Sequence, residues 1–89
     1  MNKFQIAETD HFLERIYDPK FGKMYKKIKD FVYPQLRQNP YFGSNIKKLK
    51  GNFESVYRYR IGRFRLFYVI DNDKILVLIL DLKARKDSY

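Results

Sequence analysis

The segment VYRYRIGRFRLFYVI, residues 56–70, constrains the fold of this chain more than any other stretch. Four arginines, at 58, 60, 63 and 65, interrupt an apolar run that reads as two strands on either side of Gly62-Arg63. Glycine at the first central position of a two-residue loop suits a type II′ turn, so the segment predicts an antiparallel hairpin. The sheet of this protein is therefore expected to be mainly antiparallel.

The two-residue loop also predicts which residues of the hairpin face each other. One face is apolar and should meet the helices; its members are Tyr57, Tyr59, Ile61, Phe64, Leu66 and Tyr68. On the opposite face, Arg60 lies directly across from Arg65, and Arg58 lies across from Phe67. Like charges directly opposed on paired strands destabilise a sheet by roughly 0.2–1 kcal/mol, so this arginine cluster needs an explanation.

Two explanations of the arginine cluster compete. Acidic groups could neutralise it as surface ion pairs; the candidates are Glu54, Asp81, Asp87 and the carboxylate of the last residue. Alternatively, rigid strands hold several permanently charged guanidinium groups where they bind phosphate. Neighbouring tyrosines and phenylalanines would then supply stacking surfaces for bases, as in proteins that bind single-stranded nucleic acid. We favour the anion site.

The charge of the whole chain agrees with an anionic partner. The 89 residues carry 19 Lys and Arg against 10 Asp and Glu, a net charge of +9. Residues 45–89 hold eleven basic and five acidic side chains, whereas residues 1–44 hold eight and five. Such a balance points to RNA, DNA, an anionic membrane or an acidic protein, although many small basic proteins bind nothing specific.

Composition predicts one domain, residues 1–89, with a single core and no disulfides, because the chain is short, 45% hydrophobic and free of cysteine. Residues 1–20 lack the apolar region of a signal peptide, and the apolar run at 75–80 is too short to cross a bilayer. We therefore expect a soluble cytoplasmic protein that has no membrane partner.

Familiar catalytic and cofactor sites find no support in the sequence. His11 is the single histidine and there is no cysteine, so the usual zinc sites are excluded and no Ser-His-Asp or Cys-His system is indicated. No glycine-rich phosphate-binding loop is present. We expect no metal and no cofactor, and any catalysis would depend on Arg, Lys and Tyr.

The order of elements expected along the chain is β-α-α-β-β-β, an α+β fold in which two N-terminal helices pack on one face of the sheet. We expect a short strand in KFQIAE, then a helix that Thr9 or Asp10 caps and Asp18-Pro19 ends. The later strands are expected at 55–61, 64–70 and 75–81, and IKKLKGN, residues 46–52, is interpreted as a basic connector.

The second helix is expected over about Phe21–Tyr33, with Phe21, Met24, Ile28, Phe31 and Val32 on its apolar face. Pro34 disfavours helical geometry at the residue before it. Residues 35–38 are therefore either a kinked continuation of this helix or a separate turn.

Chemistry of this kind exists for RNA, which can be cleaved by its own ribose 2′-hydroxyl. This reaction needs proton removal, stabilisation of a pentacovalent phosphorane, and a proton or positive charge at the departing 5′-oxygen. Arginine supplies the second requirement directly, but it is a poor acid or base near neutral pH. Such a site should be slow on free RNA unless something else orders the substrate.

Three motifs, LKG at 49–51, YRYRIGRFRLFYVI at 57–70 and KARKDSY at 83–89, resemble the RelE/ParE superfamily of toxin–antitoxin toxins, most closely its RelE branch. The resemblance implies a ribosome-dependent endoribonuclease that cuts mRNA without a metal. It also implies a small acidic antitoxin that holds the toxin inactive and binds operator DNA, so that this chain meets DNA only indirectly.

The resemblance assigns roles to five positions. Arg58 and Arg60 match basic residues that contact phosphates and assist proton removal, and Arg65 matches the arginine that stabilises the transition state. Arg85 matches the proton donor, and Tyr89 matches an aromatic residue that stacks on or orients the substrate.

Further basic residues are candidates for RNA binding: Lys47, Lys48, Lys50, Arg63, Lys83 and Lys86. For Arg63, a solvated charge in the hairpin turn is the simpler interpretation. The chain departs from some relatives, because it has no glutamate just ahead of LKG and no histidine near its end. A mechanism that uses arginine and lysine is what remains.

Two other functions stay open. A ParE-like toxin would inhibit DNA gyrase by protein contact, and its arginines would then be interface groups. A non-catalytic RNA-binding module would bind RNA in a salt-dependent manner without cleaving it.

Overall fold

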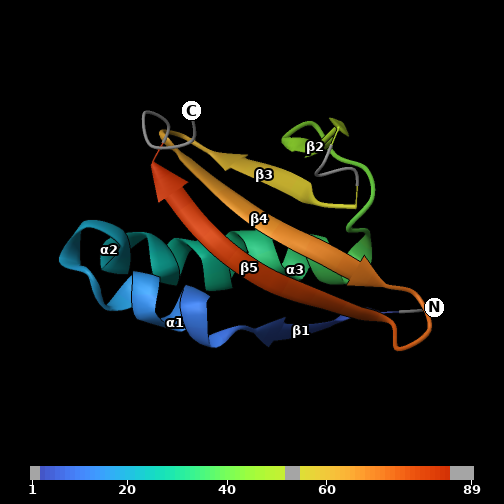
Figure 1. The fold of residues 1–89 in the computed structure, drawn as a ribbon, viewed down its shortest axis with the longest axis horizontal. Coiled ribbons are helices and arrows are strands. Elements are labelled where there is room, and N and C mark those ends of the chain that lie inside the picture. Colours follow the sequence, from blue (N-terminus) through green and yellow to red (C-terminus); the bar gives the residue numbers. More distant parts are fainter. Residues whose placement is uncertain (1–2, 52–54, 85–89) are drawn as a thin grey trace.

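Five strands form a single sheet in the computed structural model, which describes residues 3–51 and 55–84. The strands are β1 (Gln5–Glu8), β2 (Ile46–Lys48), β3 (Tyr57–Ile61), β4 (Phe64–Asp71) and β5 (Leu76–Ala84). Their order across the sheet is β1-β5-β4-β3-β2 (Figure 1). β1 pairs with β5 in parallel, and the other three pairs of neighbouring strands are antiparallel.

The expected α+β class is confirmed, but the expected set of four strands is wrong by one. β2 lies in the segment interpreted as a basic connector, and its Ile46 pairs with Tyr59 of β3. A strand of three residues at a sheet edge, two of them lysines, carries too little apolar alternation to be recognised in the sequence.

The predicted hairpin is confirmed in its register. Ile61 pairs with Phe64, and Arg60 pairs with Arg65. Gly62 has φ +56°, the left-handed geometry that glycine adopts without strain. The first central residue of the loop therefore has the positive φ that a type II′ turn requires.

Three helical segments and one π-helical turn follow β1. They are α1 (Asp10–Tyr17), α2 (Pro19–Lys27), the π-helical turn η1 (Ile28–Val32) and α3 (Tyr33–Gln38). Thr9 caps α1, since its Oγ1 accepts from the Phe12 amide at 3.2 Å. Asp18 ends α1 and caps α2, where Pro19 occupies the first turn.

The π-helical turn settles the geometry around Pro34. The helix continues through this proline into α3. The π-helical turn just ahead of it, in which the Tyr33 amide donates to the Ile28 carbonyl, accommodates a residue that has no amide hydrogen. The wider turn also shifts the apolar face by one residue. Val32 is buried as predicted and Tyr33 is buried as well, whereas the prediction that Phe31 faces the core is wrong: it is 68% exposed.

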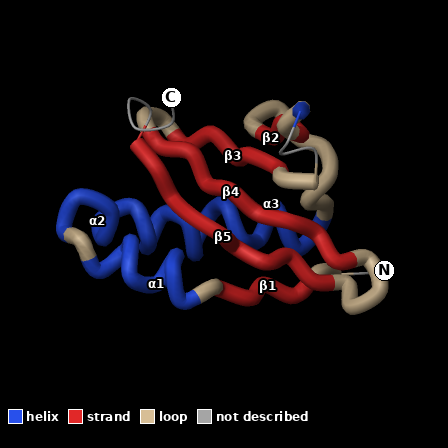
Figure 2. Tube along the Cα trace, viewed as in Figure 1, coloured by secondary structure: helices blue, strands red, loops and turns tan. Residues whose placement is uncertain are grey.

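The core lies between the helices and one face of the sheet (Figure 2). Its fully buried side chains include Phe12, Ile28, Leu36, Leu66, Tyr68, Ile79 and Leu82. Tyr17, at the end of α1, points away from this core and is 86% exposed. No helix in the part of the chain that the structure describes is long and apolar enough to span a membrane.

Candidate anion-binding site

Cationic side chains from four strands lie together on the sheet face opposite the core. The register places Lys47 beside Arg58 on neighbouring strands, and Arg65 between Arg60 and Lys83. We call these five residues, Lys47, Arg58, Arg60, Arg65 and Lys83, the arginine face. Rigid strands thus hold side chains that are up to 36 positions apart in the sequence.

Other candidate residues lie elsewhere or outside the described part of the chain. Lys48 pairs with Tyr57 in the register, on the other face of the sheet, and its Nζ lies 6.0 Å from the centre of that tyrosine ring. Arg63 is exposed at the hairpin turn, and Lys50 is exposed beyond β2. Three further candidates fall outside the described residues: Arg85, Lys86 and Tyr89.

Arg58 carries a charge that is partly removed from water. Its Nε is buried and has no hydrogen-bond partner within residues 3–51 and 55–84, and the Nε of Arg65 is buried as well. Burial lowers the pKa of Arg58, and the positive charges of Arg65 and Arg60 lower it further. Arginine still keeps its charge in proteins, so a bound anion would relieve this unfavourable concentration of charge.

Asp81 does not neutralise the arginine face. Its Oδ1 accepts from Arg15 Nε at 3.1 Å and from the Leu82 amide at 2.8 Å, while its Oδ2 lies 3.2 Å from His11 Nε2. The carboxylate is therefore held by α1, at the side of β5. Glu54 and Asp87, the other side chains considered for neutralisation, lie outside the described residues.

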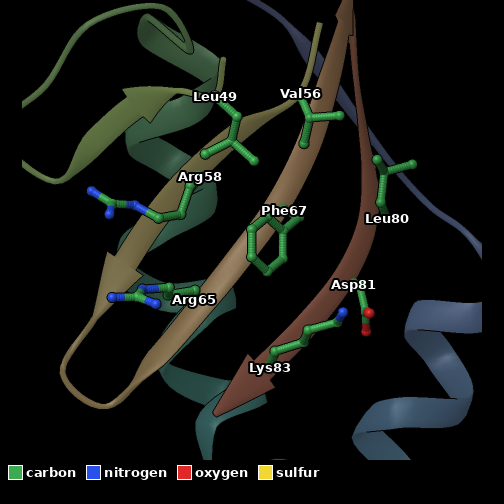
Figure 3. Close-up of a pocket in the computed structure, with 8 residues that line it drawn as sticks. All are labelled: Leu49, Val56, Arg58, Arg65, Phe67, Leu80, Asp81 and Lys83. Carbon is green, nitrogen blue, oxygen red and sulfur yellow. The ribbon is translucent and has the colours of Figure 1, made fainter. Parts of the chain in front are cut away.

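A hollow of about 430 Å³ lies beside the arginines (Figure 3). Its lining residues are Leu49, Val56, Arg58, Arg65, Phe67, Leu80, Asp81 and Lys83. Phe67 pairs with Asp81, whereas Tyr68 pairs with Ile79, so Leu80 is an extra residue in β5. This β-bulge explains how two consecutive residues, Leu80 and Asp81, both line the same hollow.

The apolar part of this hollow cannot be recognised in the sequence. Leu49, Val56 and Leu80 come from three separate segments, and the bulge that turns Leu80 toward the hollow has no signature in an unbroken apolar run. Phe67 was placed opposite Arg58 by the predicted register, which was the one available signal.

Chemically, the site offers fixed positive charge next to an apolar surface. Planar guanidinium groups bind phosphate oxygens in a bidentate manner. No group of three or more His, Cys, Asp or Glu residues that could hold a metal ion occurs among the residues the structure describes. The guanidinium groups of Arg58, Arg60 and Arg65 on this face suit recognition of a phosphodiester.

Comparisons with known proteins agree on one family. The family described as the ParE toxin of the type II toxin–antitoxin system parDE matches residues 7–89. A curated candidate toxin of Methanocaldococcus jannaschii, RelE1, is 39% identical over 98% of this chain and 96% of its own length.

Solved structures show the same fold. The toxin–antitoxin complex RelBE2 from Mycobacterium tuberculosis contains a chain that matches with a TM-score of 0.78 and 21% identity, over 93% of this chain and 99% of that one. The archaeal RelE–RelB complex from Pyrococcus horikoshii matches with a TM-score of 0.73 and 23% identity, over 93% and 96%.

Proposed function

The chain belongs to the RelE/ParE superfamily, the toxins of type II toxin–antitoxin systems, and on this premise we propose that it is a ribosome-dependent endoribonuclease. The proposed reaction is attack of the ribose 2′-hydroxyl on the adjacent phosphate of translated mRNA. It leaves a 2′,3′-cyclic phosphate on one fragment and a 5′-hydroxyl on the other.

The observation that carries this proposal is the directly opposed pair Arg60–Arg65 beside the partly buried Arg58. Opposed like charges lower the stability of a sheet. If these arginines had no function, an acidic residue in place of one of them would make the sheet more stable. A phosphate group would turn the same charges into favourable contacts.

In the proposed mechanism, Arg65 stabilises the phosphorane, because fixed charge aimed at a developing oxyanion lowers the barrier most. Arg58 and Arg60 bind the phosphate. Since arginine is not deprotonated in proteins, their help in proton removal is electrostatic: positive charge nearby lowers the pKa of the 2′-hydroxyl.

The leaving group needs positive charge at the 5′-oxygen. We assign this role to Arg85 and the orientation of the substrate nucleotide to Tyr89, both from the family resemblance and both outside the described residues. Lys83, opposite Arg65 on β5, is a described cation on the same face and would add to phosphate binding, as would Lys47.

The proposed partners follow from the family and the charge. A cognate acidic antitoxin would neutralise this chain of net charge +9, and the ribosome would supply the ordered mRNA that an arginine site without a strong base requires. Contact with operator DNA would be indirect, through the antitoxin.

Induced expression in a bacterial host, followed by primer extension on a translated mRNA, tests the proposal. Wild type should arrest growth and produce new 5′ ends inside translated codons. Arg65→Ala should produce neither, whereas Arg63→Ala, in the exposed hairpin turn, should behave like wild type. Cleavage that persists in Arg65→Ala would remove that residue from the mechanism.

A second candidate function is inhibition of DNA gyrase, which is favoured by one observation: the family that matches residues 7–89 is described as a ParE toxin. The same experiment separates the two, because a gyrase inhibitor would arrest growth while leaving the mRNA intact.

A further inference from the structure

We infer that the hollow beside Arg58 and Arg65 holds one nucleobase of single-stranded RNA, stacked on Phe67. The inference rests on the proposed function and identifies a part of the substrate that the arginines alone would not recognise. The ring of Phe67 lies in the middle of the lining residues, between the two arginines and β5 (Figure 3).

The floor of the hollow is apolar where a sheet of this kind should be polar. Four segments contribute to it: Leu49 after β2, Val56 before β3, Phe67 on β4 and Leu80 on β5. They lie on the face opposite the core, which in an antiparallel sheet ordinarily carries polar side chains toward water. An apolar surface with a few convergent charged groups is typical of a ligand site.

The arginines stand at the correct place for the phosphate of a stacked nucleotide. Arg58 is the direct cross-strand neighbour of Phe67, and paired side chains on neighbouring strands have Cβ atoms about 4.5–5.5 Å apart. A base that stacks on the ring therefore leaves its own phosphate close to a guanidinium. The volume, about 430 Å³, falls in the usual range for small ligands and suits a base splayed out of a single strand.

The negative charge at the edge of the hollow does not oppose this ligand. Asp81 is the one carboxylate among the lining residues, and Arg15 and His11 of α1 hold it at 3.1 and 3.2 Å. The guanidinium group of Arg15 offsets this charge from outside the hollow, so the hollow keeps the positive potential that attracts phosphate.

An apolar side chain of a protein partner is the other occupant that such a hollow could take. The aromatic floor and the planar guanidinium groups of Arg58 and Arg65 beside it favour a base with its phosphate, since stacking and bidentate contact use both features at once.

The test measures binding of a short single-stranded RNA that carries 2′-deoxy sugars at the cleavage positions, so that it cannot be cut. Single abasic residues are then introduced along it. For wild type, one abasic position should weaken binding about tenfold, the scale of one base–aromatic stack. For Phe67→Leu, the same position should cost less than about twofold, because the stack is already lost.

Variants separate stacking from folding. Phe67→Trp should show the same loss of RNA affinity at the abasic position as wild type. Both Phe67→Trp and Phe67→Leu keep an apolar side chain at this partly buried position, so their melting temperatures should be close to that of wild type. Phe42→Ala removes an aromatic side chain that is 79% exposed and outside the hollow, and it should leave the penalty unchanged.

An abasic penalty that is equal in wild type and Phe67→Leu would overturn the inference, and so would the absence of a penalty at every position. Cleavage of mRNA on the ribosome by the same variants reports on the proposed function separately. A protein that cleaves normally yet shows no penalty would keep the endoribonuclease proposal and lose the base site.

Discussion

At the residue scale, the closely spaced positive charges of the arginine face are expected to lower the free energy of unfolding. Arg60 and Arg65 are direct cross-strand neighbours, and Arg58 has a lowered pKa because of burial and the two nearby arginines. Residues that serve a binding site in this way are expected to be worse for the fold than neutral replacements.

A substitution at Arg60 tests both the cost in stability and the contribution to RNA binding. Arg60→Gln should raise the free energy of unfolding by about 0.2–1 kcal/mol, because it removes one of two opposed like charges, and it should weaken binding of single-stranded RNA. Urea denaturation and an RNA-binding titration give the two quantities. Arg63→Gln, at the exposed turn, is the control and should change stability by less than about 0.5 kcal/mol. A less stable Arg60→Gln protein would show that repulsion is not the dominant effect there.

Predictability from sequence differs between residues of this face. The opposition of Arg60 and Arg65 is predictable because a two-residue turn fixes the register of the two strands that it joins. The contacts of Asp81 with Arg15 and His11 are not predictable, because they join β5 to residues of α1 that lie 66 and 70 positions earlier in the sequence. The same holds for Leu80, whose orientation depends on the β-bulge.

At the scale of elements, Thr9 joins β1, α1 and β5. Its Oγ1 accepts from the Phe12 amide and donates toward the carbonyl oxygens of Ile79 and Leu80, at 2.8 and 3.2 Å. It therefore caps the helix and closes the end of the parallel strand pair.

Replacing Thr9 tests this junction. Thr9→Ala should lower the free energy of unfolding by about 1–2 kcal/mol, since it removes the N-cap and the hydroxyl that donates to the Ile79 and Leu80 carbonyls. The Ile79 carbonyl still accepts from the backbone amide of residue 9. Thr9→Ser keeps the hydroxyl and should recover most of the loss. Chemical denaturation of both variants provides the comparison; equal losses would mean that the methyl group, and not the hydroxyl, matters.

Glu8 at the end of β1 ties two helical segments to the sheet. Its Oε2 accepts from the hydroxyls of Tyr25 and Tyr33 at 2.7 and 2.8 Å. Burial, with the hydrogen bond and the charge of Glu8, raises the pKa of Tyr25 to about 12; the same causes raise the pKa of Tyr33.

Stability should therefore fall in alkali. The unfolded tyrosine loses its proton near pH 10, whereas folded Tyr25 retains it up to about pH 12, so the stabilisation is complete below pH 10 and is lost as pH rises toward 12. Urea denaturation between pH 8 and 12 should show a shallower decline for Tyr25→Phe than for wild type. Tyr17→Phe, at an exposed position, should decline like wild type, and an unchanged slope in Tyr25→Phe would contradict the assignment.

Elements differ in how far local sequence determines them. The hairpin and the cap at Thr9 are predictable because their signals lie within a few residues. The π-helical turn is harder to foresee, since an alternative exists at Pro34, a break in the helix, and the packing of Val32 and Tyr33 decides between them. β2 forms by pairing with β3. The sequence of its own three residues does not indicate a strand.

At the scale of the whole molecule, the net charge of +9 governs encounter with partners. Opposite charge accelerates association, and salt screens it. The α+β class and the family are both recognisable from the sequence, because the strand pattern and the basic motifs extend over most of the C-terminal half.

The association rate with the proposed acidic antitoxin should therefore fall steeply as salt increases, while the dissociation rate changes little. Stopped-flow mixing from about 50 to 500 mM salt would measure both rates. The double variant Lys47→Gln/Lys83→Gln should show a weaker dependence of the association rate on salt. An association rate that does not change with salt in wild type would exclude electrostatic steering.

The central claim is that the arginine face cleaves mRNA on the ribosome, and the most direct test uses purified protein, ribosomes and a defined mRNA. Wild type should cut the ribosome-bound mRNA and leave a 2′,3′-cyclic phosphate, Arg65→Ala should be slower by about 100-fold or more, and Arg63→Ala should match wild type. Free mRNA should be cut far more slowly. Cleavage that Arg65→Ala retains in full, or intact mRNA in every reaction, would contradict the account.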